Sequence, residues 1–483
     1  MRDHATIFGP ILQRALQHAL QHLESIDDRS IGATVDLAQL RARFDQPLLD
    51  TGLAPMQVID ELVRDVEGGI IGNVGGRFFG WVIGGSLPAA LAADWLTSAW
   101  DQNAAIHACG PAEAVIEEVA GSWLKRLFRL PDTASFAFVT GTQMAHLTCL
   151  AAARHRLLAR AGWDVEQDGM AGAPPIRLIT SSEHHGSIDR AARILGLGTR
   201  AVSALPCDAQ GRLDPRSLAA AFETCPAQPT IVVLQAGDLN IGAFDPFEQL
   251  IPIARERDAW VHIDGAFGLW VGASAKHRHL LRGAEMADSW TSDGHKWLNT
   301  PFDCGYAFVA DADAHFSAFS HRTSYRLYTE SARDEIDWTP EWSRRGRGVA
   351  TYAALRQLGR AGVSELIDRT CAHAHALVTR IGGLPGAEMV WEPTINQGLV
   401  RFIDPRRGAI DEDHDRRTDE VIRRIVSQAE AFFGGTTWRG KRCMRVSVCN
   451  WQTNEADLER AVHAVRRALG NLPVDSDPLG RTN

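Results

Sequence analysis

The sequence predicts an α/β protein with a large, mainly parallel-sheet domain and a small α+β domain after it. Three observations support this prediction. Short runs rich in β-branched and aromatic residues alternate with helical stretches over residues 76–345. Over residues 346–470 the order changes to a helix, several strands and a final helix. The chain of 483 residues, 45% of them hydrophobic, is also too long for one ordinary domain.

The first region, residues 1–75, is predicted to be a helical arm. Residues 7–24 and 55–67 carry the apolar spacing of amphipathic helices. Two helices and a loop bury too little surface to be stable alone, so we expect the arm to pack on a partner subunit. The first twenty residues lack the apolar core of a signal peptide, and no later stretch is long enough to span a bilayer. These features favour a cytoplasmic protein.

The large domain, residues 76–345, is expected to contain at least five strands. They cover residues 135–140, 176–181, 230–235, 260–264 and 305–310. Residues 143–160 and 246–257 between them are strongly helical. In a parallel sheet of this kind ligands bind at the carboxyl ends of the strands. Polar motifs that follow a strand are therefore the first candidates for a functional site.

The small domain, residues 346–470, begins with a helix and ends with another over residues 455–469. Its predicted strands cover residues 388–391, 399–403 and 445–449. The tail, residues 471–483, is rich in polar and turn-forming residues, and we expect it to be loose.

The composition argues against several classes of partner. A formal charge of −9 and a pI near 6.1 do not favour nucleic acid or a membrane surface. Eight cysteines without a CxxC pair fit free thiols in a reducing compartment better than a disulfide framework. No run of side chains has the spacing of metal ligands, so we expect no metal.

The motif Ser292-Asp-Gly-His-Lys-Trp-Leu298 contains the strongest candidate for catalysis, Lys296. A lysine between histidine and tryptophan, after an apolar-leaning segment, is unusual because lysines prefer solvent. An amine in a largely closed site loses its charge more easily, and a neutral amine forms an imine with a carbonyl cofactor. Taken alone, the motif fits a surface lysine at the end of a strand equally well.

Asp264 ends the apolar run Trp260-Val-His-Ile-Asp264 and is followed by the small residues Gly265 and Ala266. A buried carboxylate is costly without a partner. A protonated pyridine nitrogen would be such a partner, and the carboxylate would keep the ring cationic so that it accepts electrons. A helix cap or a metal ligand is the alternative. The stretch between Asp264 and Lys296 leaves room for one helix and one further strand, so both can reach one sheet edge.

The segment Phe138-Val-Thr-Gly-Thr-Gln143 joins a strand to a helix. Free N–H groups and the helix dipole at such a turn attract an anion. Thr142 and Gln143 would donate to a phosphate from backbone and side chain. The segment is not a GxxxxGK[ST] loop, which argues against ATP. An ordinary turn between a strand and a helix is the alternative.

A fourth motif, Ser181-Ser-Glu-His-His185-Gly-Ser187, also follows a predicted strand. An imidazole here could stack on a cofactor ring and transfer a proton. A single histidine in a loop more often has a structural role. The spacing alone does not choose between His184 and His185.

In this order, the four motifs resemble the group II amino-acid decarboxylases, which depend on pyridoxal 5'-phosphate (PLP). This family includes the aromatic amino-acid, glutamate, histidine and diaminobutyrate decarboxylases. The resemblance runs from the segment 77–81 to about residue 465, and its most specific marks are residues 264–266 and 295–297. Residues 242–246 and 343–345 add to it. The family's His-x-Ser pattern selects His185 as the stacking residue.

The resemblance implies a fold-type I PLP-dependent transferase, similar to aspartate aminotransferase, that forms an obligate homodimer. It implies α-decarboxylation of an L-amino acid to an amine and CO2 through a Lys296 aldimine and a quinonoid. Asp264 would then pair with the pyridine nitrogen and Ala266 would pack on the ring. The phosphate contacts that the resemblance implies are Thr142, Gln143, Asp293 and His295.

The chain departs from the family pattern in three places. The segment 141–146 ends in His146 where the family's form, close to GGSEAN, has asparagine. Residues 236–240 bring Asp238 and Asn240 near the cofactor in place of a threonine hydroxyl. The loop at about residues 325–342 is short, and Tyr328 within it is our candidate for the proton donor to Cα, although a tyrosine that only packs the loop fits as well.

Aromatic residues bear on the choice of substrate. By resemblance, Trp81 and Trp100 lie near the substrate entrance and Phe302 near the subunit interface. Aromatic walls favour an aromatic L-amino acid. Oxidative deamination to an aldehyde, lyase chemistry and transamination are alternatives on the same scaffold, and a silent binding protein is a further one. We interpret Arg445 as a structural or interface arginine, not as the carboxylate-binding arginine of a transaminase.

Overall fold

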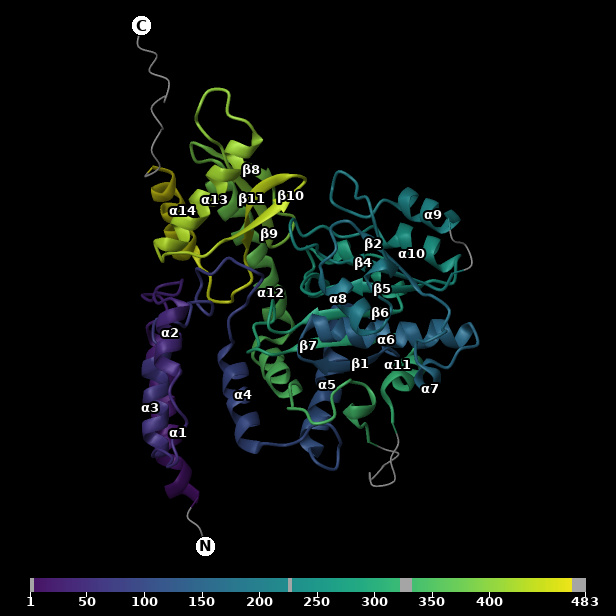
Figure 1. Ribbon diagram of the computed structural model, residues 1–483, viewed down its shortest axis with the longest axis horizontal. Helices are drawn as coiled ribbons and strands as arrows, with labels where there is room; N and C mark the ends of the chain where they lie inside the picture. Colours follow the sequence, from purple (N-terminus) through teal and green to yellow (C-terminus); the bar gives the residue numbers. More distant parts are fainter. Residues whose placement is uncertain (1–3, 225–227, 322–331, 471–483) are drawn as a thin grey trace.

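A helical arm, a large α/β region and a small α+β region follow one another along the chain in the computed structural model (Figure 1). The structure describes residues 4–224, 228–321 and 332–470. Within these ranges no helix is both long and apolar enough to cross a membrane. The seven cysteines in the described part are free thiols.

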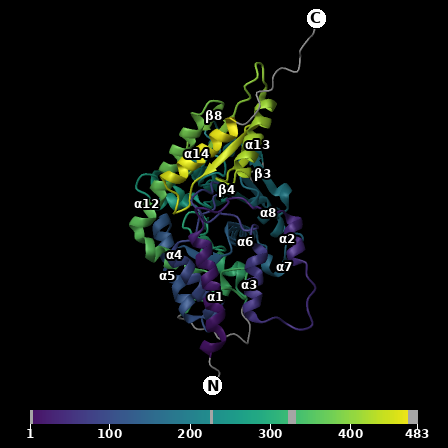
Figure 2. The same cartoon turned by 90° about the vertical axis from the view of Figure 1, so that its left-hand side faces the viewer.

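The arm consists of α1 (His4–Glu24), α2 (Leu37–Phe44) and α3 (Pro55–Val66). The helices α1 and α3 pack side by side, and Asp60 holds them together by accepting from Arg14 Nε at 2.6 Å and lying 2.8 Å from His18 Nε2 (Figure 2). Apolar side chains along both helices are 41–59% exposed: Ile7, Leu12, Leu16, Leu20, Leu23, Val58 and Leu62. An exposed apolar stripe of this kind indicates a surface made to be covered.

The large region contains a seven-stranded sheet in the order β1-β7-β6-β5-β4-β2-β3. The strands are β1 (Ser135–Val139), β2 (Arg177–Ser181), β3 (Val202–Leu205), β4 (Thr230–Gln235), β5 (Trp260–Asp264), β6 (Ser289–Asp293) and β7 (Gly305–Val309). All run in parallel except β7, which is antiparallel to its neighbours β1 and β6. The central strands are buried throughout, which explains their continuous apolar runs.

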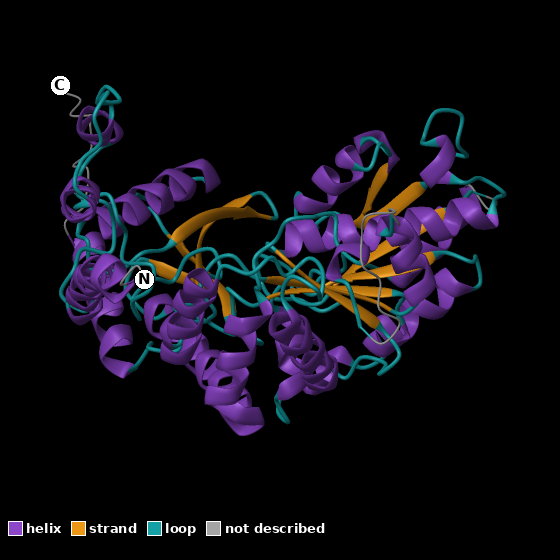
Figure 3. Cartoon of the chain, turned by 90° about the horizontal axis from the view of Figure 1, so that it is seen from below, coloured by secondary structure: helices purple, strands orange, loops and turns teal. Residues whose placement is uncertain are grey.

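Helices cover both faces of this sheet (Figure 3). One face packs against α6 (Thr142–Arg160), α8 (Ser187–Ile194) and α11 (Ala312–Phe319). The other packs against α5 (Pro111–Phe128), α9 (Pro215–Thr224) and α10 (Phe247–Arg255). The remaining helices of this region are α4 (Pro88–Trp100), α7 (Val165–Asp168) and the short 3-10 turns η1 (Thr199–Ala201), η2 (Gly268–Ala273), η3 (Arg278–Leu281), η4 (Ala284–Met286) and η5 (Glu335–Asp337).

The small region has a four-stranded antiparallel sheet in the order β10-β11-β9-β8. Its strands are β8 (Ala387–Trp391), β9 (Gln397–Phe402), β10 (Gly434–Trp438) and β11 (Lys441–Ser447), and α13 (Asp411–Ser427) and α14 (Glu455–Gly470) pack on them. Phe79 is fully buried in this core, and Phe78 stacks on Phe432 with ring centroids 4.5 Å apart. Residues 78–79, which the sequence assigned to the large domain, therefore pack with the small one.

The long helix α12 (Gly348–Gly382) connects the two regions (Figure 1). It is interrupted at Gly359, whose φ of 60° lies in the left-handed region that glycine tolerates. The helix packs against α4 and α5, and its residues up to Cys371 belong to the core of the large region, whereas those from Ala374 onward join the core of the small region. The change of domain therefore falls inside this helix.

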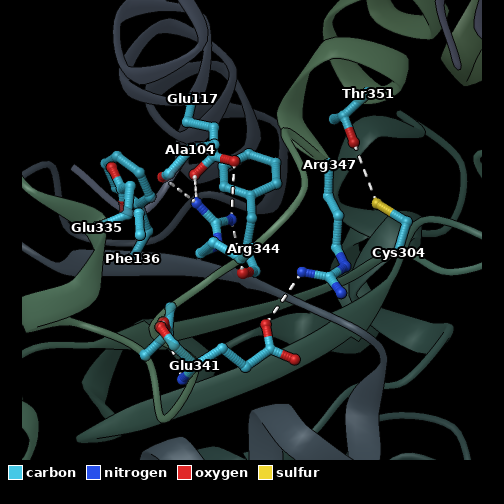
Figure 4. A network of polar contacts seen from close by, with 12 residues as sticks. Ala104, Glu117, Phe136, Cys304, Glu335, Glu341, Arg344, Arg347 and Thr351 are labelled. Atoms are coloured by element: carbon cyan, nitrogen blue, oxygen red, sulfur yellow. Dashed lines mark hydrogen bonds and ion pairs between the residues drawn. The ribbon is translucent and has the colours of Figure 1, made fainter. Parts of the chain in front are cut away.

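A buried ion pair fixes the segment before α12 to the large region (Figure 4). The Arg344 guanidinium donates to both carboxylate oxygens of Glu117 at 2.8 and 3.0 Å, and both side chains are fully buried. The same guanidinium donates to the carbonyl oxygens of Ala104 and Phe138. Burial raises the pKa of Glu117, and the bidentate contact with Arg344 opposes that rise.

The predicted fold class is confirmed. Strands β3 and β10 were missed, and β6 was expected only as one further strand, without bounds, between Asp264 and Lys296. The sequence of β6 is Ser-Trp-Thr-Ser-Asp, and its polar residues conceal a strand that is buried throughout. Strand β10 begins with two glycines, which are rare in strands, and β3 is a short edge strand. Strand β6 is the one that carries Lys296 to the sheet edge, as the expected further strand required.

Candidate active site

A cavity of about 580 Å³ lies at the carboxyl ends of the parallel strands, a size typical of small-molecule sites. Residues that follow β1, β2, β4, β5 and β6 line it, together with Arg445 from β11. Nine residues that the sequence analysis singled out share this lining: Trp81, Thr142, Gln143, His185, Asp264, Ala266, Asp293, His295 and Lys296.

One end of the cavity is the turn between β1 and α6. The backbone N–H of Thr142, the first residue of α6, donates to Asp293 Oδ1 at 2.6 Å. The Thr142 Oγ1 atom is buried and has no hydrogen-bond partner among the described residues. A Cβ atom at Gly305 would lie only 2.4 Å from the Cα of Gly141, so glycine is required for this turn to approach β7. The hydroxyl and the helix N-terminus together suit an anionic group.

Lys296 follows β6 and lines the cavity. Its Nζ lies 3.2 Å from Asp293 Oδ2 and 5.8 Å from the centroid of the Phe267 ring. The chain has only four lysines: Lys125, Lys276, Lys296 and Lys441. Lys296 is the only one of them in the lining of this cavity. If any lysine of this chain bonds a ligand in the cavity, it is Lys296.

Asp264 ends β5, and it lines the cavity although the residue is only 8% exposed. The backbone N–H of Ala266 donates to its Oδ1 at 3.1 Å. Burial alone would raise the pKa of this carboxyl. The neighbouring imidazoles of His146 and His185 and the amine of Lys296 outweigh burial, so the pKa of Asp264 lies below its ordinary value. The residue is therefore a carboxylate at neutral pH.

His185 opens the loop before α8. The backbone N–H of Ser187 donates to its Nδ1 at 3.2 Å, and Ser187 Oγ lies 2.7 Å from the same nitrogen. Nδ1 is thus an acceptor, which leaves the proton of a neutral ring on Nε2. Burial lowers the pKa of His185 and favours that neutral form. By contrast, His184 pairs with Asp189 at 2.9 Å and does not line the cavity.

His295 lies beside Lys296 in the lining. Its Nδ1 accepts the backbone N–H of Cys304 at 3.2 Å, and its ring stacks on Phe302 with centroids 4.3 Å apart. Burial lowers the pKa of His295. Phe302 does not itself line the cavity and is 58% exposed, so its predicted place at a subunit interface stays a prediction.

Three further candidates are not brought to the cavity. Trp100 ends α4 and is 48% exposed outside the lining. Asn240 is buried between the two domains, accepting from Thr436 Oγ1 at 2.7 Å. Asp238 accepts three backbone N–H groups of its own turn, from Asn240, Ile241 and Ala243. Tyr328 lies outside the described residues, so its role stays a prediction.

Two arginines line the cavity that the sequence did not place there, Arg190 and Arg445. Arg190 lies one turn after Ser187 on α8, at the i+3 position that would have placed it on the same face. Arg445, interpreted from sequence as a structural arginine, both donates to the carbonyl oxygen of Leu239 at 2.9 Å and lines the cavity. Because Arg445 lies on β11, in the other domain, no local sequence pattern indicated that it lines the cavity.

Residues 40–403 match the family model described as the pyridoxal-dependent decarboxylase conserved domain. The chain belongs to this family. It is 25% identical over 468 residues to the aromatic-L-amino-acid decarboxylase of Bacillus atrophaeus, with 95% of each chain covered. It is 26% identical over 481 residues to human cysteine sulfinic acid decarboxylase, with 95% of this chain and 94% of the relative covered.

Solved structures confirm the fold-type I prediction. The chain superimposes on the crystal structure of Oryza sativa TDC with PLP and tryptamine at a TM-score of 0.90, with 23% identity and 97% and 99% of the two chains covered. Against mouse CSAD the TM-score is 0.89, with 23% identity and 96% and 98% covered. The predicted family is confirmed by the family model.

The residues of the cavity fit pyridoxal phosphate, the cofactor of this family. The cofactor requires an amine for its aldehyde, a carboxylate for its ring nitrogen and donors for its phosphate. Lys296 and Asp264 meet the first two needs from adjacent strands. The unpartnered hydroxyl of Thr142, buried at the start of α6, meets the third.

Proposed function

We propose that the chain decarboxylates an L-amino acid to an amine and CO2 with pyridoxal phosphate bound to Lys296. The observation that carries this proposal is the single cavity that contains Lys296, Asp264 and the turn at Thr142. The other lysines do not compete for the role. Lys125 donates to the carbonyl oxygens of Asp132 and Ala134, and Lys276 is 74% exposed.

When bound, the cofactor supplies a cationic ring that accepts the electron pair released as the Cα–carboxylate bond breaks. Asp264 holds the proton on the ring nitrogen, because a low pKa keeps the carboxylate ionised beside it. Thr142 and Gln143 donate to the phosphate. Asp293 orients both the Thr142 N–H and the Lys296 amine, since one carboxylate oxygen faces each.

His185 and Ala266 line the same cavity and would flank the ring. His185 is neutral and carries its proton on Nε2, so it can donate to the substrate without a net charge of its own. Tyr328 remains our candidate for returning a proton to Cα. If Tyr328→Phe increased aldehyde and peroxide formation at the expense of amine, that would support this role.

We favour an aromatic L-amino acid as substrate, because Trp81, Val82 and Phe267 give the cavity an apolar wall. An acidic amino acid is the second candidate, and Arg190 and Arg445 in the same lining favour it. CO2 release should be measured across aromatic, acidic and basic L-amino acids, with peroxide followed in parallel. Arg190→Met should then reduce turnover of an acidic substrate selectively. Absence of CO2 with every amino acid would contradict the decarboxylase proposal.

We also propose a homodimer in which the arm covers the partner subunit. The exposed leucines of α1 and the apolar residues of α3 form a stripe that nothing within the described chain covers. Light scattering of the purified protein should give twice the chain mass. A monomer of full activity would contradict the proposal. Leu12→Glu with Leu16→Glu should weaken the dimer, whereas Arg64→Glu on the same arm should not.

A further inference from the structure

A row of four buried side chains, none of which the sequence motifs linked to this carboxylate, leads to Asp264 from inside the protein. They are His146 on α6, Trp260 and His262 on β5, and Ser289 on β6. Each is at most 4% exposed, and none of the four lines the cavity. They lie inside the protein, behind the carboxylate and outside the lining of the cavity.

These side chains form a continuous chain of polar contacts. Trp260 Nε1 donates to Ser289 Oγ at 2.9 Å, and Ser289 Oγ lies 2.8 Å from His262 Nδ1. His262 Nε2 lies 2.9 Å from His146 Nδ1. His146 Nε2 lies 3.4 Å from Asp264 Oδ2 and has no hydrogen-bond partner among the described residues. The chain thus ends at the carboxylate.

The donor and the acceptor of each hydrogen bond in this chain follow from the side chains involved. An indole N–H only donates, so Ser289 Oγ accepts from Trp260 and can give its own hydrogen to His262 Nδ1. Burial lowers the pKa of His262 well below its ordinary value, so this ring is neutral and its proton is on Nε2. It then donates to Nδ1 of His146, whose own proton is left on Nε2, facing Asp264. In either direction of the contact between the two rings, Nε2 of His146 carries the N–H that faces Asp264, because an acceptor nitrogen there would require a protonated Asp264, against its lowered pKa.

We propose that His146 is a positioning residue which, oriented by His262, Ser289 and Trp260, donates to Asp264 and keeps that carboxylate ionised and directed into the cavity. This rests on the proposed function, in which Asp264 holds a proton on the ring nitrogen of the cofactor. The arrangement leaves the other carboxylate oxygen to Ala266 N–H and the ligand. His146 would act on Asp264 in the same way as the outer partners in metal sites, which orient the residues that bind the metal.

The test compares His146→Phe, His146→Gln and the wild-type holoenzyme. Phenylalanine keeps the ring volume and removes both nitrogens, whereas glutamine restores an N–H near the position of Nε2. The main measurement is the NMR signal of cofactor labelled with a heavy isotope at the ring nitrogen, which reports its protonation without turnover. We expect the wild type to be protonated through neutral pH. His146→Phe should lose that protonation at a lower pH than the wild type, and glutamine should recover it in part.

The expected effect on turnover is a fall in kcat of roughly 10- to 100-fold for His146→Phe, by analogy with the range found when an outer partner of a metal ligand is removed. His315→Phe is the matched control. His315 is also fully buried, and its ring contacts Ser135 Oγ and the carbonyl oxygen of Trp338, both at 2.8 Å. It should lose comparable stability and leave the cofactor signal unchanged. If His146→Phe does not fold, Ser289→Ala removes one link with little change of volume and should shift the signal in the same direction.

Two failures are distinguishable. A wild-type protein that binds no pyridoxal phosphate would overturn the proposed function. A wild-type holoenzyme with a protonated ring, combined with an unchanged signal in His146→Phe, would overturn the role of His146 alone. An equal shift in His315→Phe would show that the effect is only structural, and would also overturn it.

Discussion

Two groups of buried polar and charged side chains lie in the large domain. The side chains of the first group are enclosed by the protein, whereas those of the second group border a cavity. In the closed cluster, defined as Glu117, Arg333, Glu335, Arg344 and His315, opposite charges pair within the protein. Arg333 Nε is 2.8 Å from Glu335, and its guanidinium also lies 4.1 Å from the centroid of Phe136. At the cavity, by contrast, Asp264, His185 and Lys296 face a common space.

This difference distinguishes a structural polar group from a functional one. Burial and an altered pKa are common to both sets, so neither feature identifies a site by itself. What separates them is the direction of the remaining donors and acceptors. Arg344 is enclosed by Glu117 and two carbonyl oxygens (Figure 4), whereas the polar atoms at the cavity converge on a volume that suits a cofactor.

The largest expected effect is that of Lys296→Ala. Removing the covalent amine should lower kcat on the order of 10⁴-fold or more, as the loss of a covalent nucleophile does. Thermal unfolding of the cofactor-free protein should change little, because Asp293 is the one ion-pair partner of Lys296 in the described part of the chain and the lysine side chain is 22% exposed. Lys276→Ala, at an exposed lysine, is the matched control. If Lys296→Ala kept full activity, the proposed distinction between the functional cavity and the structural closed cluster would fail.

Breaking the closed cluster should affect stability instead of chemistry. Glu117→Leu leaves the Arg344 charge buried without its partner, which should cost about 3–5 kcal/mol of unfolding free energy. Denaturant titration measures this loss, and kcat of the protein that remains folded should be close to wild type. The double variant with Arg344→Met should recover part of the stability. A loss of kcat without a loss of stability would contradict the structural assignment.

A fall in pH should affect the closed cluster and the cavity differently. Burial lowers the pKa of His315 to about 3 from an ordinary value of 6.5. The neutral ring therefore contributes stability that is present above pH 6.5 and is lost as the pH falls towards 3. Between pH 7 and 5 this loss amounts to about 2 kcal/mol.

His315→Phe should abolish this part of the pH dependence, which unfolding experiments at the two pH values would detect. Asp264 has a lowered pKa, so its contribution is lost only at pH values below its ordinary 3.8. The visible absorption of bound cofactor should therefore persist at pH 5 in the protein that remains folded. The assignment of His315 would fail if the variant kept the full acid sensitivity of the wild type.

The smallest effect should come from the aromatic wall. Trp81 lines the cavity, and its ring lies 4.8 Å from that of Phe432. Trp81→Ala should raise KM by roughly fivefold, which corresponds to about 1 kcal/mol of lost aromatic contact. Trp100→Ala should raise it less, since Trp100 lies outside the lining of a single chain. An equal rise for both would indicate that Trp100 reaches the site of the partner subunit.

Functional side chains at the ends of strands were easier to predict from the sequence than side chains buried within a strand or a helix. Asp264 and Lys296 could be placed together because strand ends share one edge of a parallel sheet. His146 and His262 could not, because no local pattern links a position on α6 to a buried position on β5 far along the chain. Arg445 reaches the cavity from another domain, and its contact depends on how the two domains dock. Long-range packing, which spacing does not encode, decided these cases.

Locating the cofactor on the chain would test the assignment of Lys296 most directly. The protein is loaded with pyridoxal phosphate, reduced with borohydride and digested, and the modified peptide is identified by mass spectrometry. With only four lysines, the outcome is unambiguous. We expect a stable adduct on Lys296 that is absent from Lys296→Ala. A stoichiometric adduct on Lys125, Lys276 or Lys441, or no adduct at all, would contradict it.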